Sequence, residues 1–352
     1  MNLQKLLYEC LAQRASDLHL SSGSPPKLRL DGDLVAMSDV PLAHEALHLA
    51  LLGIMSPAQQ TQFSQSHECD FSFDVPALSR FRANVFMQAR GVSAVFRVIP
   101  HHIPSLESLN APAVIAELLH RTQGLVLVTG ATGSGKSTTL AAMVDALNQT
   151  QSKHIITIED PIEFVHTPQQ CLIQQRELGA HTLSYANALR AALREDPDVI
   201  LVGELRDLET IRLAITAAET GHLVLATLHT SSAAKTMDRV VDVFPAQEKE
   251  MVRSMLSESL NAVISQVLCK RKDGQGRVAA FEVMVGTPAV RNLIREGKVA
   301  QLYSAVQTGR SVGMQTLDQS LAALAQQDLI DQHTAGALST VPQNLGVNRA
   351  AG

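Results

Sequence analysis

The chain has 352 residues, which is room for about two domains, and 45% of them are apolar, which is ample for a buried core. With 29 basic and 34 acidic residues, its formal net charge is −5, and it has no Trp and only 3% aromatic residues. A net negative charge does not indicate a basic surface for a nucleic-acid backbone, and so few aromatic side chains leave little on which bases could stack. The composition therefore argues against a nucleic-acid partner.

The N-terminal part, up to about residue 100, is predicted to be a small α+β domain. Leu3, Leu6, Leu7 and Leu11 share one face of a helix. Strands are expected at 17–20 and 27–30, with a turn at 31–33 into another strand, and a helix at 43–52. A polar helix should begin after Ser56, with Pro57 in its first turn. Three further strands are expected at 69–75, 80–88 and 93–98.

Arginines accompany these last strands, and a proline-rich break follows them. The arginines concerned are Arg80, Arg82, Arg90 and Arg97. They are either solvated side chains on outward faces, or some of them point at a phosphate on a neighbouring subunit. Residues 100–111 are predicted to be a linker, and the adjacent His101 and His102 have no third metal ligand nearby.

The segment 124–138, GLVLVTGATGSGKST, predicts a phosphate-binding loop between a buried strand and a helix. Glycines let backbone N–H groups approach phosphate oxygens, and the helix N-terminus adds unpaired donors. Lys136 should reach the β- and γ-phosphates, and Ser137 should ligate Mg²⁺. The alternative, a glycine turn that binds nothing, does not explain the match at all fixed positions. The expected ATP-binding residues are Gly130, Ala131, Thr132, Gly133, Ser134, Gly135, Lys136, Ser137 and Thr138.

Two more apolar strands end in acidic residues. The strand at 155–158 leads to Glu159, Asp160 and Glu163. The strand at 199–202 leads to Glu204, a Walker B pattern whose acid would organise Mg²⁺ through water. Because the carboxyl ends of parallel strands face the ligand crevice, these carboxylates can order Mg²⁺ waters or polarise an attacking water. Arg194 and Arg206 flank this second strand and either pair with carboxylates or meet phosphate.

Two histidines bracket the apolar strand expected at 223–228. His229 follows its carboxyl end and could donate a hydrogen bond to a γ-phosphate, and His222 precedes the strand. The alternative for each is a polar residue of the core. Their spacing does not support a zinc site.

The four segments GATGSGKST, ITIEDPIEF, DPDVILVGELRD and TGHLVLATLHT, in this order, resemble the secretion ATPase superfamily that powers type II secretion and type IV pili. The family calls them Walker A, Asp box, Walker B and His box. Segments 15–20, 29–32, 80–84 and 95–100 resemble the N-terminal domain of its pilus-retraction members. Segment 289–298, AVRNLIREGK, resembles the element tied to retraction, with Val290 in place of Ile. The resemblance extends from about residue 2 to 332, and the tail 340–352 matches nothing and is expected to be flexible.

Two absences favour the retraction branch. Extension and secretion members carry a tetracysteine zinc insert, which the scattered Cys10, Cys69, Cys171 and Cys269 cannot form, so free thiols are expected. Those members also carry a longer N-terminal region, for which this chain is too short. No signal-peptide core or apolar run of the ~20 residues of a membrane span is visible.

The resemblance implies an α/β protein with a PAS-like α+β domain at 1–99, the linker at 100–111, and a RecA-like P-loop ATPase domain with a helical C-terminal region at 112–352. It implies a homohexamer that hydrolyses ATP, with Mg²⁺ as the metal cofactor. The ring would be cytoplasmic, peripheral at the inner membrane through the pilus machinery. The expected partners are the inner-membrane pilus platform protein and, as an open alternative, a paralogous retraction ATPase.

The resemblance also assigns roles to residues at matching motif positions. Glu163 would be the catalytic base, Glu204 the Walker B acid that organises Mg²⁺, and His222 and His229 the His-box residues. Arg82 and Arg97 would contact the nucleotide. The helix with Arg291, Arg295 and Lys298 is either a partner surface or a solvated basic face.

Three other functions stay open from the sequence: an accessory retraction ATPase that modulates a principal motor, a nucleic-acid translocase on the same core, and a non-catalytic scaffold ring.

Overall fold

The computed structural model describes residues 1–30, 32–76, 78–99, 102–274 and 276–339. Contacts divide the chain into two compact units. One is Met1–His102 with Pro161–Phe164, and the other is Ile103–Asp160 with Val165–Gly352. The predicted linker begins with residues 100 and 101, which lie outside the described residues, as does the whole tail 340–352.

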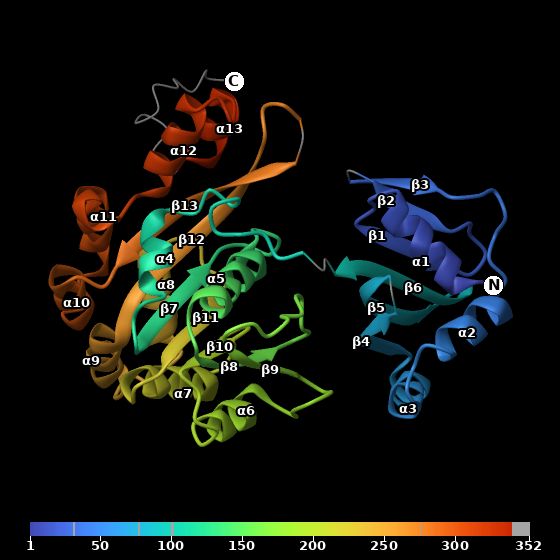
Figure 1. Ribbon diagram of the computed structural model, residues 1–352, viewed down its shortest axis with the longest axis horizontal. Helices are drawn as coiled ribbons and strands as arrows, with labels where there is room; N and C mark the ends of the chain where they lie inside the picture. The colour runs from blue at the N-terminus through green and yellow to red at the C-terminus, as the bar shows by residue number, and fades with distance from the viewer. Residues whose placement is uncertain (31, 77, 100–101, 275, 340–352) are drawn as a thin grey trace. The chain divides into compact units, whose positions relative to one another are not determined.

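The first unit is a six-stranded antiparallel sheet with helices packed on it (Figure 1). Alternate strand residues such as Leu18, Phe81 and Phe96 point into one apolar core together with Leu7 and Leu47 of the helices. The strand order is β3-β2-β1-β6-β5-β4. The elements are α1 (Leu3–Ala12), β1 (Asp17–Ser21), β2 (Lys27–Leu30), β3 (Asp33–Ala36), α2 (His44–Leu52), α3 (Pro57–Ser66), β4 (Glu68–Val75), β5 (Ser79–Gln88) and β6 (Gly91–Ile99).

The start of α3 confirms the prediction from Ser56 and Pro57. Ser56 Oγ accepts a hydrogen bond from the Gln59 backbone, and the Gln59 side chain accepts one from the Ser56 backbone N–H. This reciprocal capping satisfies two amides that a helix start leaves open. The helix therefore begins where its sequence indicates, although it buries only Phe63.

The second unit is built on a seven-stranded sheet of order β13-β12-β7-β11-β10-β8-β9. All neighbouring strands are parallel except the β12–β13 hairpin, which is antiparallel. The strands at 125–128, 155–158, 199–202 and 223–228 are confirmed, whereas β9, β12 and β13 were not predicted. The strands are β7 (Gly124–Thr129), β8 (His154–Glu159), β9 (Leu172–Glu177), β10 (Val199–Val202), β11 (Leu223–Leu228), β12 (Leu260–Lys270) and β13 (Arg277–Val285).

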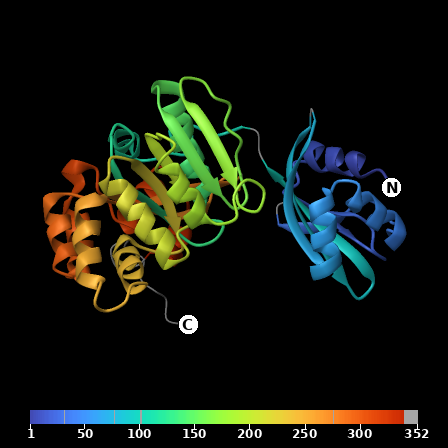
Figure 2. The ribbon, with the colours of Figure 1, turned by 90° about the horizontal axis from the view of Figure 1, so that it is seen from below.

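Helices cover both faces of this sheet, which gives three layers (Figure 1 and Figure 2). Leu125 and Leu127 pack with α6 to α11 on one face, and Val126 and Val128 pack with α4 and α5 on the other. None of the helices in the described ranges has both the length and the apolar character needed to cross a bilayer. The helices are α4 (Ala113–Leu118), α5 (Lys136–Thr150), α6 (Tyr185–Ala192), α7 (Leu208–Glu219), α8 (Ala233–Asp242), α9 (Lys249–Ser259), α10 (Pro288–Arg295), η1 (Val299–Gln301), α11 (Leu302–Thr308), η2 (Arg310–Val312), α12 (Leu317–Gln326) and α13 (Gln332–Leu338).

All four cysteines are free thiols, as predicted, and all are buried. They are at most 4% exposed. Burial raises the pKa of each thiol, for Cys10 and Cys269 to about 11. They behave as small apolar side chains of the core rather than as reactive groups.

Arg291, in the segment that resembles the retraction element, caps the end of another helix. Its guanidinium donates to the backbone carbonyls of Gly286 (2.8 Å), Leu260 (3.1 Å), Ser257 (3.2 Å) and Glu258. Ser257 and Glu258 belong to the last turn of α9, whose carbonyls have no partner within the helix. Burial lowers the pKa of Arg291. Arg291 is therefore engaged within the fold rather than solvated, whereas Arg295 and Lys298 are exposed.

We predict that Arg291→Lys lowers the melting temperature by on the order of 5 °C, because one ammonium cannot serve four carbonyls held by a planar fork. Thermal unfolding of the full chain measures this shift. The matched control is Arg295→Lys on the exposed face of the same helix, which should change it by less than about 1 °C. Equal shifts in the two variants would contradict the capping role.

Candidate active site

The glycines of the P-loop adopt conformations that other residues avoid. Gly130 has a φ of 146° and Gly135 one of 90°. A Cβ on Gly130 would lie 2.5 Å from the carbonyl oxygen of Gln266 in β12, so no larger residue fits there. The loop therefore needs glycine to run close against β12 and to begin α5 at Lys136.

The Walker A lysine folds back over its own loop. Lys136 is 8% exposed, and its Nζ donates to the carbonyls of Gly130 and Ala131, both at 3.0 Å. Nζ also lies 3.4 Å from His229 Nδ1. Because an ammonium can only donate, His229 Nδ1 must be the acceptor and its Nε2 must carry the proton.

That proton points to the Walker B acid, which continues the chain of contacts. His229 Nε2 lies 3.1 Å from Glu204 Oε1, and Arg206 Nε donates to Glu204 Oε2 at 2.7 Å. Arg206 Nη1 also donates to Asp160 Oδ2 at 3.3 Å, and the hydrogen bond to Glu204 is the main cause that raises the pKa of Arg206. Side chains of all four motifs are thus linked at the carboxyl ends of β7, β8, β10 and β11. Of the two arginines flanking β10, Arg206 pairs with carboxylates.

His222 and Glu163 are not part of this cluster. His222 precedes β11 and its Nδ1 lies 3.1 Å from the carbonyl of Ala217. The six residues of β11 separate it from His229 by roughly 20 Å. Glu163 is exposed, and its segment, Pro161–Phe164, groups with the first unit rather than with the P-loop unit.

The two candidate arginines lie in register on the first unit's sheet. Arg82 on β5 is opposite Arg97 on β6, and Arg97 is opposite Asp17 on β1. Arg82 makes a two-point ion pair with Asp70, with nitrogen–oxygen distances of 3.0 and 2.6 Å. Arg97 Nε donates to the buried Asp17 at 2.9 Å while 66% of its side chain stays exposed. Both arginines therefore have carboxylate partners that fix their direction.

Gln266 is a site residue that the sequence analysis missed. It lies in β12, 2% exposed, and its Nε2 donates to the carbonyl of Ser134 at 2.6 Å while its Oε1 accepts from Thr139 Oγ1 at 2.9 Å. It thus joins the loop to the first turn of α5. Two polar residues, Ser265 and Gln266, within the otherwise apolar run 262–268 were the available signal, but the strand itself was not predicted.

The residues present suit a bound nucleotide with its metal. Ser134 Oγ is buried and has no hydrogen-bond partner among the described residues, as a phosphate-facing hydroxyl would. Mg²⁺ in nucleotide sites usually takes one or two oxygen ligands from the protein, and its other ligands are phosphates and water. Glu204 and Ser137, which is half-buried in the first turn of α5, offer such oxygens.

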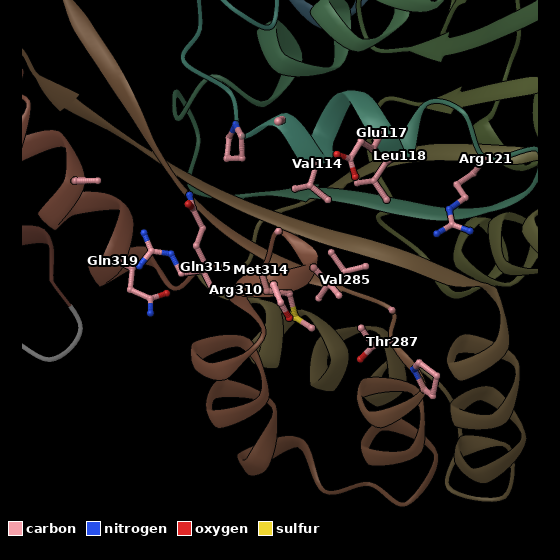
Figure 3. A pocket seen from close by; sticks show the side chains of 18 of the residues that line it. Val114, Glu117, Leu118, Arg121, Val285, Thr287, Arg310, Met314, Gln315 and Gln319 are labelled. Atoms are coloured by element: carbon pink, nitrogen blue, oxygen red, sulfur yellow. The ribbon is translucent and has the colours of Figure 1, made fainter.

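A separate cavity of about 970 Å³ lies between α4, the end of β13 and the turn before α12 (Figure 3). Val114, Val285 and Met314 line its apolar part, and Figure 3 shows Arg121 and Arg310 on opposite sides of it. None of the P-loop residues and neither Glu204 nor His229 lines it, so it is distinct from the nucleotide site.

We predict that Gln266→Leu weakens binding of Mg²⁺·ATP about tenfold, because the loop and α5 lose their shared hydrogen-bond partner. Fluorescence titration with a labelled nucleotide measures the Kd. The control is Ser265→Ala, its buried neighbour in β12, whose Oγ lies 2.7 Å from Thr129 Oγ1 and which should change the Kd less than about twofold. Equal affinity in Gln266→Leu and the unchanged chain would refute the clamp.

Comparison with known proteins agrees with the motifs. The family model described as type II/IV secretion system protein matches residues 1–330. The type IV pilus retraction ATPase PilT of Pseudomonas aeruginosa is 59% identical over 344 residues, 98% of this chain and 100% of that protein. A twitching motility protein of Neisseria gonorrhoeae is 56% identical over 328 residues, covering 92% of this chain and 88% of its own length.

A solved structure agrees as well. The crystal structure of the pilus retraction motor PilT with bound ADP is 47% identical and superposes with a TM-score of 0.91, covering 98% of this chain and 99% of that one. The chain belongs to the type II/IV secretion system protein family and, within it, to the pilus-retraction ATPases that its motifs indicated.

Proposed function

We propose that this chain is the ATP-hydrolysing motor of type IV pilus retraction. The observation that carries the proposal is the contact chain from Lys136 through His229 to Glu204. The protein that contains these contacts matches a retraction ATPase over nearly the full length of both chains. The motor works as a homohexamer in the cytoplasm, peripheral at the inner membrane, and acts on the pilus platform protein, with a paralogous retraction ATPase as a second partner. No nucleic-acid partner is proposed.

The finer fold assignments belong to this proposal. The first unit, with helices packed on an antiparallel sheet, is taken as PAS-like. The second is taken as RecA-like, because its parallel strands carry the P-loop after β7 and acidic residues at the next strand ends. Residues 112 onward, with the C-terminal helices, form this ATPase part.

Nucleotide binding uses groups that the P-loop already presents. Backbone N–H groups of the loop, Ser134 Oγ and Lys136 Nζ would hold the phosphates, and Ser137 and Glu204 would hold Mg²⁺. Bound Mg²⁺ neutralises charge on the phosphates. Glu163, an exposed carboxylate, serves as the base that orients the attacking water.

The proposed response to the nucleotide starts at Lys136. On binding, its Nζ exchanges loop carbonyls and His229 Nδ1 for phosphate oxygens. His229, released by Lys136, is then free to turn its Nε2–H from Glu204 Oε1 to an oxygen of the γ-phosphate. Loss of that phosphate restores the contact with Lys136, so His229 reports hydrolysis to its loop. His222, at the other end of β11, would act through the strand.

Two arginines of the first unit are candidates for contacts with phosphate. Arg97 lines a cavity of about 650 Å³ with Arg14 and His102. Its exposed guanidinium, held by the buried Asp17, and that of Arg82 suit a polyanion approaching this face. We assign both arginines to contacts with the phosphates of a nucleotide.

We predict that Glu163→Gln lowers kcat for ATP at least about 10²-fold while the Kd for ATP stays within about twofold, because an amide cannot accept the proton of water. Steady-state ATPase assays and nucleotide titration measure the two values. The control is Glu159→Gln in the same segment, whose carboxylate already accepts from Thr157 Oγ1 and Gln175 Nε2. Turnover at the normal rate in Glu163→Gln would show that another group is the base.

We also predict that deleting the gene leaves cells with excess surface pili and no twitching, and that the intact chain restores both while Glu163→Gln does not. A motor that removes pilin subunits accounts for both effects. Pilus counts by electron microscopy and twitching-zone diameters are the measurements. Deleted cells that twitch normally would identify an accessory ATPase instead, and DNA-stimulated hydrolysis would identify a translocase.

A further inference from the structure

One buried carboxylate lies at the N-termini of two helices. Glu282 in β13 is 7% exposed, and its Oε1 accepts from the backbone N–H of Ala233, the first residue of α8, at 2.6 Å. It also lies near the backbone N–H of Leu317, the first residue of α12, which lowers its pKa. Burial raises the pKa of Glu282, and the nearby Asp318 adds to this effect. A buried carboxylate is costly unless it is fully hydrogen-bonded, so this geometry is specific.

Neither helix needs Glu282 as a cap. Ser232 caps α8 by accepting from the Lys235 backbone N–H. Thr316 caps α12 in a reciprocal arrangement with Gln319. Glu282 accepts from the first amide that the cap of α8 leaves open and lies near the first amide of α12, and its charge is favourable at both helix N-termini. What it adds is a shared partner that links the two helices.

On the α8 side, the link leads directly to the candidate phosphate sensor. His229 is four residues before Ala233, and the segment between them is braced. Thr230 Oγ1 lies 2.7 Å from Thr236 Oγ1, and Thr236 Oγ1 donates to the carbonyl of Ser232 at 2.7 Å. A displacement of the α8 N-terminus is therefore passed to His229 over a short, tied segment.

On the α12 side, the link leads to the C-terminal helices. Phe281 N–H donates to Ser320 Oγ at 3.0 Å, and Val283 and Gln315 exchange backbone hydrogen bonds of 2.9 and 3.1 Å. The start of α12 is thus fixed to the residues on either side of Glu282. The packing of α12 with α13, β12 and β13 forms a hydrophobic cluster of its own.

We propose that Glu282 is a positioning residue that holds His229 against Lys136 and Glu204 through α8 and couples that loop to α12. The C-terminal helices then follow the nucleotide state of the site. The inference rests on the proposed function, because His229 must respond to the γ-phosphate.

The first test is Glu282→Gln in the full chain. The amide has the same size and can accept from one helix, but its own N–H groups oppose the other backbone amide. We expect kcat for ATP to fall about ten- to hundredfold through misplacement of His229, while KM stays within about twofold. The melting temperature should fall by on the order of 5 °C.

The matched control is Asp318→Asn. Asp318 is also a buried carboxylate, 4% exposed, in the first turn of α12, and it accepts from Ser339 Oγ at 2.9 Å. It should lower the melting temperature similarly and leave kcat within about twofold. A normal kcat in Glu282→Gln, or an equal loss in Asp318→Asn, would show that Glu282 only stabilises the fold. Absence of hydrolysis by the unchanged chain would instead contradict the proposed function.

A second measurement tests the coupling without hydrolysis. Amide hydrogen exchange is followed with and without a non-hydrolysable ATP analogue. In the unchanged chain, the analogue should alter exchange in α12 about fivefold or more, and in Glu282→Gln only in the P-loop and α5. The proposal would be overturned if the analogue left hydrogen exchange in α12 unaltered in the unchanged chain. It would also be overturned if the analogue still altered exchange in α12 in Glu282→Gln.

Discussion

The second unit depends on a row of alternating charges at one edge of its sheet. Lys136, His229, Glu204, Arg206 and Asp160 follow one another at distances of 2.7 to 3.4 Å. They come from segments far apart in sequence and meet because parallel strands all end at the same edge. Two cations and two anions balance in this row, so its net formal charge is zero. In the proposed function, a bound triphosphate would add negative charge at the lysine end of this row.

The elements with local signals were predictable from sequence, and those held by distant partners were not. The strand and helix around the P-loop follow from an apolar run and a fixed glycine pattern, and α3 follows from Ser56 and Pro57. The β12–β13 hairpin carries Gln266 and Glu282 inside apolar runs. Their partners, Ser134 and Ala233, lie 132 and 49 residues away in the chain. No local pattern encodes such pairs, so these residues are visible only in the folded structure.

Motif membership predicted site chemistry unevenly for the same reason. Glu204 follows β10 after Gly203 and His229 directly follows β11, and the fold brings the two side chains together. His222 shares a motif with His229 but stands at the other end of β11. Glu163 shares a segment with Asp160, yet the chain passes to the other unit between them. Residues of one motif can thus lie apart in the structure. The length of β11 separates His222 from His229, and the boundary between the two units separates Asp160 from Glu163.

The buried cysteines give this chain a practical property. With every native thiol inside the core and its pKa raised, little thiolate is present near neutral pH. A single cysteine introduced on an exposed helix face would therefore be the group that a maleimide dye modifies. The native sequence needs no cysteine removal before fluorophores are attached for single-molecule recordings of the motor.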